Sequence, residues 1–221
     1  MHNLSLNEYQ QLTVDSSILS CDEFGDKVLA LNDQSIIKLF RVKRFISQAT
    51  LYSPARRFAR NVRCLKKIGI PTVTIIDLYK ISDLKRTAVH YKPLKGLTVR
   101  EYMQQHGTFP EFLEKFGIFL ARMHNKGVFF RSAHFGNIVY TPEKEFGLID
   151  VSDMSISPFS LGFFKRIRNL KHIFRVREDV DFILDSSIIE QSYLQHCPIK
   201  NAIFKHYFLQ RIKYMKLNAC N

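Results

Sequence analysis

Cysteine, glycine and acidic residues are scarce in this sequence of 221 residues, and tryptophan is absent. The four cysteines, at positions 21, 64, 197 and 220, stand far apart and form no CxxC pair. This spacing argues against a disulfide scaffold or a cysteine zinc site, so we expect reduced thiols in a reducing compartment. The N-terminus has no basic segment followed by an apolar run, and no stretch approaches the roughly 18 apolar residues of a membrane span. A cytoplasmic location is therefore expected, with peripheral contact to the inner membrane surface still allowed.

Acidic side chains are also outnumbered, because 33 Lys and Arg stand against 20 Asp and Glu and leave a formal net charge of +13. A field of this sign attracts nucleic acid, lipid headgroups or phosphorylated small molecules, and it does not choose among them. The apolar content of 46% is too high for a disordered chain. The length predicts one or two domains.

Residues 1–94 have the pattern of a sheet with one helix. Two apolar runs, 27–32 and 35–40, predict an antiparallel hairpin, and Lys38 lies inside the second run. A helix is then predicted between Ser53 and Gly69, with Pro54 in its first turn. One face of this helix is apolar and the rest is cationic, with Arg56, Arg57, Arg60, Arg63, Lys66 and Lys67. Residues 72–79 and 86–91 predict two more strands.

Residues 95–221 are mostly helical in pattern. Thr98 and Glu101 form a capping box for a short helix, and a second helix is predicted from Pro110 to Lys126. Short apolar segments between 128 and 151 predict a small hairpin, and residues 159–217 return to helix. The sequence therefore predicts an α+β protein with a sheet-rich lobe over 1–94 and a helical lobe over 95–221.

One segment carries a recognisable motif: MHNKGVFFRSAHFGN at 123–137, followed by FGLID at 146–150. It resembles the catalytic segment of the protein-kinase-like fold, LH..G..HRDL...N and then an apolar strand ending in Asp. In this register Arg131 stands at the Arg position, Asn137 at the Asn position and Asp150 at the metal-binding Asp. The resemblance implies a two-lobed kinase-like fold.

Phosphoryl transfer explains why these residue types are needed. Its transition state is stabilised mainly by positioning and charge, so the site needs a cation on the ATP phosphates and ligands for Mg²⁺. Lys38 can supply the cation, and the oxygens of Asn137 and Asp150 are of the hard type that Mg²⁺ prefers. We expect these three residues to bind the cofactors, ATP and Mg²⁺.

Among kinase-like families, the chain most resembles the lipopolysaccharide core kinases and the small bacterial kinases named for toluene tolerance. The segments FARNVRCLKKIGIPTV, YKPLKGLTVREYM and GVFFRSAHFGNIV carry this likeness, which covers roughly residues 25–180. It implies a sugar or a lipid-linked saccharide as the acceptor of the phosphoryl group, with ATP as the other partner.

The sequence also departs from the kinase pattern. Ser132 occupies the position of the general-base Asp, Phe130 that of the preceding His, and Asn61 that of the helix Glu that would pair with Lys38. There is no GxGxxG loop. Arg131, Ser132 and His134 are the catalytic-loop candidates, with His134 and then Asp153 as possible replacements for the base. A missing base costs about 10²- to 10⁴-fold in rate without removing the metal and nucleotide sites.

Other interpretations stay open. The chain could be a pseudokinase, a kinase-shaped module that senses nucleotide or associates with a membrane. Nucleic-acid binding is not expected, because the sequence contains no recognised nucleic-acid-reading module. Lys38 could be an edge-strand lysine, and Asn137 and Asp150 could be turn residues. The cations between 165 and 177 are expected to face outward, either solvated, paired with acids at 178–181 or docked on an anionic membrane, while Phe163, Phe164 and Ile167 pack inward.

Overall fold

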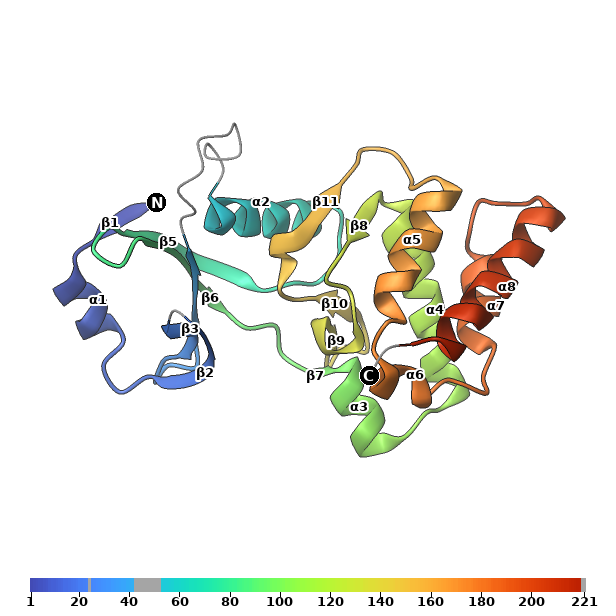
Figure 1. Cartoon of the computed structure of the whole chain (residues 1–221), viewed down its shortest axis with the longest axis horizontal. Coiled ribbons are helices and arrows are strands. Elements are labelled where there is room, and N and C mark those ends of the chain that lie inside the picture. The colour runs from blue at the N-terminus through green and yellow to red at the C-terminus, as the bar shows by residue number, and fades with distance from the viewer. Residues whose placement is uncertain (24, 42–52, 220–221) are drawn as a thin grey trace. The chain divides into compact units, whose positions relative to one another are not determined.

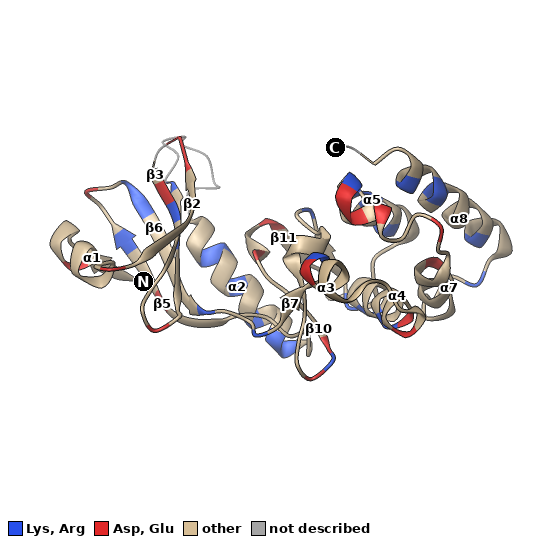
Figure 2. Ribbon diagram, turned by 90° about the horizontal axis from the view of Figure 1, so that it is seen from below, with Lys and Arg blue, Asp and Glu red and all other residues tan. Residues whose placement is uncertain are grey.

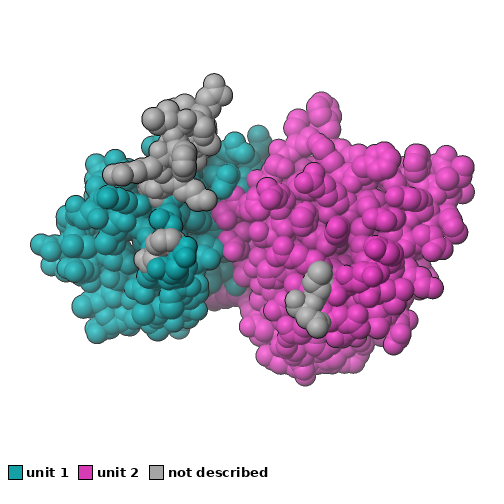
Figure 3. Space-filling model, in the orientation of Figure 1, with its two compact units in different colours: residues 1–67, 72–94 teal, residues 68–71, 95–221 magenta. Residues whose placement is uncertain are grey.

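The computed structural model describes residues 1–23, 25–41 and 53–219 and has the expected α+β class (Figure 1). The chain divides into two compact units, residues 1–67 with 72–94 and residues 68–71 with 95–221 (Figure 3). Cys21, Cys64 and Cys197 form no disulfide with one another, and Cys220 lies outside the described residues. No helix in the described part of the chain is long and apolar enough to cross a membrane.

The first unit is built on a six-stranded mixed sheet in the order β1-β5-β6-β4-β3-β2. β1 pairs with β5 in parallel and the other neighbours are antiparallel. The predicted hairpin is confirmed as β3 and β4, with Gln34 at φ 64° in the turn between them. The elements of this unit are β1 (His2–Leu4), α1 (Leu6–Leu12), β2 (Ser17–Asp22), β3 (Gly25–Ala30), β4 (Ile36–Arg41), α2 (Pro54–Lys67), β5 (Thr74–Ile81) and β6 (Arg86–Lys92).

Helix α2 follows the predicted pattern closely. Ser53 Oγ accepts a hydrogen bond from the Arg56 amide at 3.3 Å, and Pro54 is the first helical residue. Phe58, Val62 and Leu65 are buried where α2 packs on β4, β5 and β6, while all six predicted cations are exposed. Figure 2 shows these cations along the helix. The spacing of apolar residues was sufficient to predict this helix because it depends on local pattern and caps alone.

The second unit combines helices with two small sheets, in the orders β10-β9-β7 and β11-β8. α7 packs against α4, and α8 packs against α5 and α7 (Figure 1). The unit contains β7 (Leu97–Thr98), α3 (Val99–His106), α4 (Pro110–Asn125), β8 (Val128–Phe130), the 3-10 turn η2 (Phe135–Asn137), β9 (Ile138–Tyr140), β10 (Phe146–Leu148), the 3-10 turn η3 (Val151–Asp153), β11 (Met154–Ile156), α5 (Phe163–Ile173), α6 (Arg177–Asp181), α7 (Ile188–Gln195) and α8 (Ala202–Leu217).

A glycine allows the close approach of α4 and α7. A Cβ built on Gly117 would lie 2.0 Å from the Ser192 side-chain oxygen and 2.5 Å from the Ile189 carbonyl oxygen. Any larger residue at 117 would push the two helices apart. The crossing holds together part of the core that supports the segment 123–150.

The expectation for α5 was wrong at two positions. Arg166, predicted to face solvent, is fully buried, and Phe164, predicted to pack inward, is 76% exposed. Arg166 can be buried because its guanidinium donates to neutral oxygens from several segments: Leu161 O at 2.7 Å, Asn125 Oδ1 at 2.7 Å, Ser160 Oγ at 2.6 Å and Tyr193 Oη at 3.0 Å. Buried polar groups are tolerated when their hydrogen bonds are made, and a pattern of apolar spacing does not reveal such distant partners.

Candidate functional site

Asn137 and Asp150 are placed by one small hairpin. β9 and β10 pair antiparallel, with Ile138 at the start of β9 opposite Leu148 at the end of β10. Asn137, just before β9, therefore lies beside Ile149, just after β10. The Ile149 amide donates to the Asn137 carbonyl oxygen at 3.1 Å. The hairpin therefore brings residue 137 next to residues 149 and 150, as two ligands of one ion would require.

The side chain of Asn137 has a defined orientation. The side-chain Nδ2 of Asn137 donates to the Ser132 carbonyl oxygen at 2.8 Å, and the backbone N–H of Asn137 donates to the His134 carbonyl oxygen at 2.9 Å. These two hydrogen bonds close the loop 132–137, and the first of them uses the side-chain nitrogen of Asn137. The Oδ1 atom is thereby left as the acceptor end of the side chain, and an amide oxygen is the atom that Mg²⁺ would bind.

Asp150 occupies an unusual backbone conformation. It has φ 52° and ψ 44°, the left-handed region, which Asp tolerates better than most residues. The side chain is half-buried, and Ser152 Oγ donates to its Oδ1 at 3.4 Å. This bend takes the chain from β10 into η3 and sets the carboxylate at the end of the hairpin. A local strain of this kind is often found at functional sites.

The loop is also closed on its other side by the pairing of β8 with β11. Phe130 lies opposite Met154, and the Arg131 amide donates to the Asp153 carbonyl oxygen at 3.1 Å. The Arg131 Nε atom lies 3.7 Å from Asp153 Oδ2, and both side chains are about half exposed. Such an exposed pair contributes little stability. The backbone hydrogen bond of Arg131 thus ties the loop to η3. The Asp153 carboxylate is occupied by the Arg131 side chain.

His134 is held as a structural cap. Its Nδ1 accepts a hydrogen bond from the Gly136 amide at 3.1 Å at the start of η2. Burial lowers the pKa of His134 below its ordinary value, although Asp179 acts in the opposite direction. The neutral ring therefore carries its proton on Nε2 and has no unused lone pair in this arrangement. A base role for His134 stays a prediction that requires this bond to open.

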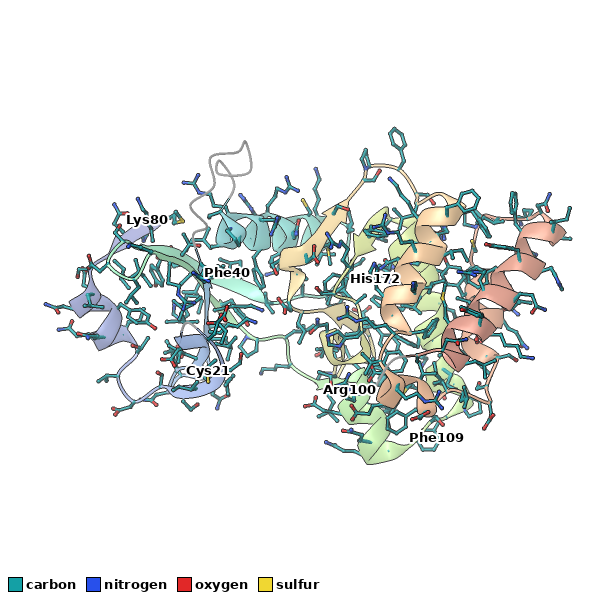
Figure 4. All side chains as sticks on the ribbon, in the orientation of Figure 1. Cys21, Phe40, Lys80, Arg100, Phe109 and His172 are labelled. Atoms are coloured by element: carbon teal, nitrogen blue, oxygen red, sulfur yellow. The ribbon has the colours of Figure 1, made fainter. Side chains whose placement is uncertain are left out.

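Asp179 on α6 holds the loop 132–137 through the Phe135 amide. Asp179 was not identified from the sequence as a residue of this site. It is fully buried, and its carboxylate accepts from the Phe135 amide at 3.1 Å and from Arg100 Nε at 2.6 Å. Arg100 extends from α3 (Figure 4), and the hydrogen bond to Asp179 raises its pKa. Asp179 was expected only as a partner of the cations before it. The one signal in the sequence was an acidic residue within a basic segment.

A buried hydrogen-bond network fixes β8, the strand that leads into the loop. Asn169 on α5 accepts from the Phe130 amide at 3.2 Å and donates to the Phe130 carbonyl oxygen at 2.6 Å. His124 Nε2 donates to Asn169 Oδ1 at 3.1 Å, and Tyr193 donates its hydroxyl to His124 Nδ1 at 2.7 Å. Complete burial lowers the pKa of His124 to about 3, so the ring is neutral. His124 belongs to the motif, and its role here is to position the strand.

Lys38 and Asn61 lie in the first unit. Lys38 is only 8% exposed and sits on β4, an interior strand, paired with Val28 and Val89. The alternative of an edge-strand lysine is therefore wrong. Asn61 is buried on α2, a helix with no acidic residue to pair with a lysine. That Lys38 binds the same ATP and Mg²⁺ as Asn137 and Asp150 stays a prediction, because Lys38 belongs to the other unit.

Within the described residues, no group of three or more His, Cys, Asp and Glu could hold a metal ion. A site made of Asn137 and Asp150 supplies two protein oxygens, which suits Mg²⁺, an ion that is commonly bound by few side chains together with water and phosphate. No protein-family model matches the chain, and no curated protein sequence matches it.

Proposed function

We propose that this protein is a two-lobed, protein-kinase-like phosphotransferase that moves the γ-phosphoryl group of ATP to a sugar or a lipid-linked saccharide. The observation that carries the proposal is the hairpin that sets Asn137 beside residues 149 and 150, with the Asn137 amide nitrogen bonded to the Ser132 carbonyl. This arrangement offers one amide oxygen and one carboxylate at a single hairpin end. Because its nitrogen is bonded to the Ser132 carbonyl, the Asn137 side chain would present its amide oxygen to the ion.

Each residue has a stated task in the proposed reaction. Asn137 and Asp150 would hold Mg²⁺, which when bound neutralises charge on the ATP phosphates. Lys38 contributes a cation for the same phosphates from the interior of its sheet. Arg131 and Asp179 position the loop between β8 and η2. The saccharide acceptor is what the family resemblance implies, and the positive net charge is compatible with an anionic acceptor without selecting a saccharide.

A second candidate function is a pseudokinase that binds nucleotide without turnover. Ser132 supports it, because a serine hydroxyl is no base at neutral pH, and the Nδ1 atom of His134 already accepts a hydrogen bond. The two candidates share the nucleotide site and differ only in chemistry.

One experiment separates them. The full chain is incubated with γ-labelled ATP, Mg²⁺ and a panel of core oligosaccharides, next to Asp150→Asn and a control, Asp185→Asn, which changes an exposed carboxylate of the same unit. We expect labelled saccharide with wild type and the control, and none with Asp150→Asn. A rise in the melting temperature of the protein on addition of ATP and Mg²⁺, without any labelled product, would favour the pseudokinase. Neither product nor stabilisation would refute both candidates.

A further inference from the structure

Helix α8 is apolar on two sides. Its inner side buries Phe208, Ile212 and Met215 against the rest of the second unit. Its outer side carries a stripe at helical spacing, formed by Ile203, Tyr207, Tyr214 and Leu217, which are 78%, 45%, 57% and 58% exposed. An amphipathic helix at a protein surface normally has a single apolar face, and that face is covered by the core. The exposure of this apolar outer stripe to water is energetically unfavourable.

Helix α5 extends this stripe with aromatic rings. The Phe163 ring centroid lies 4.9 Å from that of Phe204 and 5.9 Å from that of Tyr207. Phe164 lies 5.5 Å from Phe163 and is 76% exposed. These four rings are contiguous, and exposed apolar surface of this kind marks an interaction site. We call it the α5/α8 surface, made of Phe163, Phe164, Ile203, Phe204, Tyr207, Tyr214 and Leu217.

The two helices of the α5/α8 surface carry charges of one sign, and the acids Asp185 and Glu190, which lie outside these helices, line a pocket only at the Leu217 end of the surface. Neither helix contains an Asp or a Glu, and Figure 2 shows that the charged residues along α8 are all basic. On α5, Arg168 and Lys171 follow Phe164 by four and seven residues, so the three share one helix face. Lys165 and Lys171 are exposed and make no ion pair within the described part of the chain. The Arg211 guanidinium lies over the Tyr214 ring, 5.4 Å from its centroid.

We propose that the α5/α8 surface docks onto an anionic lipid bilayer. Phenylalanine and isoleucine side chains enter the boundary between headgroups and acyl chains, tyrosine stays at that boundary, and lysine and arginine reach the lipid phosphates. A second copy of the chain is a poorer occupant. A two-fold dimer would place the same acid-free, cationic helices against each other. The docking stands independently of phosphoryl transfer and uses none of its residues.

The size of each contribution sets the expected effects. A lysine near an anionic leaflet strengthens binding about fivefold, so Lys165→Gln with Lys171→Gln should weaken binding about 25-fold. Replacement of two inserted apolar side chains by serine, Phe164→Ser with Ile203→Ser, should weaken binding about 100-fold. Both residues are more than 75% exposed, so this variant should melt at the wild-type temperature.

The test is co-sedimentation of the full chain with vesicles of phosphatidylglycerol and phosphatidylcholine, and with phosphatidylcholine alone, at low and high salt. The matched control is Ile18→Ser with Phe109→Ser, which removes two apolar side chains, 56% and 52% exposed, from other places on the chain (Figure 4 labels Phe109). We expect salt-sensitive binding to the anionic vesicles for wild type and control, and loss of binding for Phe164→Ser with Ile203→Ser.

Three results would overturn the proposal. Wild type could fail to bind anionic vesicles at low salt, or the α5/α8 variant could bind them as tightly as the control. Sedimentation equilibrium without lipid could instead show a dimer that the α5/α8 variant abolishes, which would assign the surface to a second copy of the chain.

Discussion

Acidification should destabilise the fold, and the largest single contribution should come from His124. The ring is completely buried, accepts a hydrogen bond from Tyr193 and donates one to Asn169, and its pKa is lowered to about 3. In the unfolded chain a histidine has a pKa of about 6.5. The unfolded state therefore binds a proton between these two values while the folded state does not. The contribution of the neutral His124 ring to the unfolding free energy is fully present above pH 6.5 and is lost as the pH falls toward 3.

The magnitude follows from the shift. Each pH unit below the unfolded pKa costs about 1.36 kcal/mol, so the fall from pH 8 to pH 5 should remove about 2 kcal/mol through His124. Burial also lowers the pKa of His90, His134 and His172, and these groups add a loss of the same sign. A comparison between wild type and a neutral variant at position 124 cancels their contribution.

Urea unfolding of wild type and His124→Gln at pH 8 and pH 5 provides the assay. The variant loses hydrogen bonds and is less stable at pH 8, but the gap should shrink by about 2 kcal/mol at pH 5. His106→Gln, at an exposed histidine, controls for the substitution itself. Parallel losses for wild type and His124→Gln would contradict the buried, neutral histidine. If His124→Gln does not fold, an NMR titration of wild type gives the same answer, because the ring should stay neutral at pH 5.

Three further changes test the supporting structure. Asp179→Ala should cost about 2 to 3 kcal/mol in unfolding free energy, because a buried amide and a guanidinium lose their acceptor, and phosphoryl transfer should fall with it. Gly117→Ala should lower the melting temperature by several degrees while Gly162→Ala, where a Cβ meets no atom within 4 Å, should not. Lys216→Met should cost about 3 to 5 kcal/mol in urea unfolding, because it leaves Glu190 buried without its 2.5 Å partner. Equal stability of variant and wild type would contradict each argument.

Features of the fold that depend on neighbouring residues could be predicted from the sequence. The hairpin of β3 and β4, the caps of α2 and the capping box of Thr98 and Glu101 all rest on residues a few positions apart. The order of Asn137 and Asp150 around one hairpin belongs to the same class. Such patterns carry their own physical cause, so one sequence is enough.

Features that join distant segments could not be predicted. Asp179 meets Arg100 across 79 residues, and Arg166 finds acceptors on several separate segments. The error on α5 has the same origin. Charge and hydrophobicity alone predict an exposed Arg166 and a buried Phe164, whereas burial depends on partners that the local pattern does not contain.

Calorimetric titration of ATP into the full chain, with and without Mg²⁺, tests the central claim most directly. Asp150→Asn is the decisive variant, because Asn also tolerates the left-handed backbone at this position and the fold should be retained. Asp185→Asn is the matched control. We expect Mg²⁺-dependent ATP binding for wild type and the control, and its loss for Asp150→Asn at wild-type stability. Equal ATP binding by Asp150→Asn and wild type, or none by wild type, would contradict a phosphate and metal site at the end of the β9–β10 hairpin.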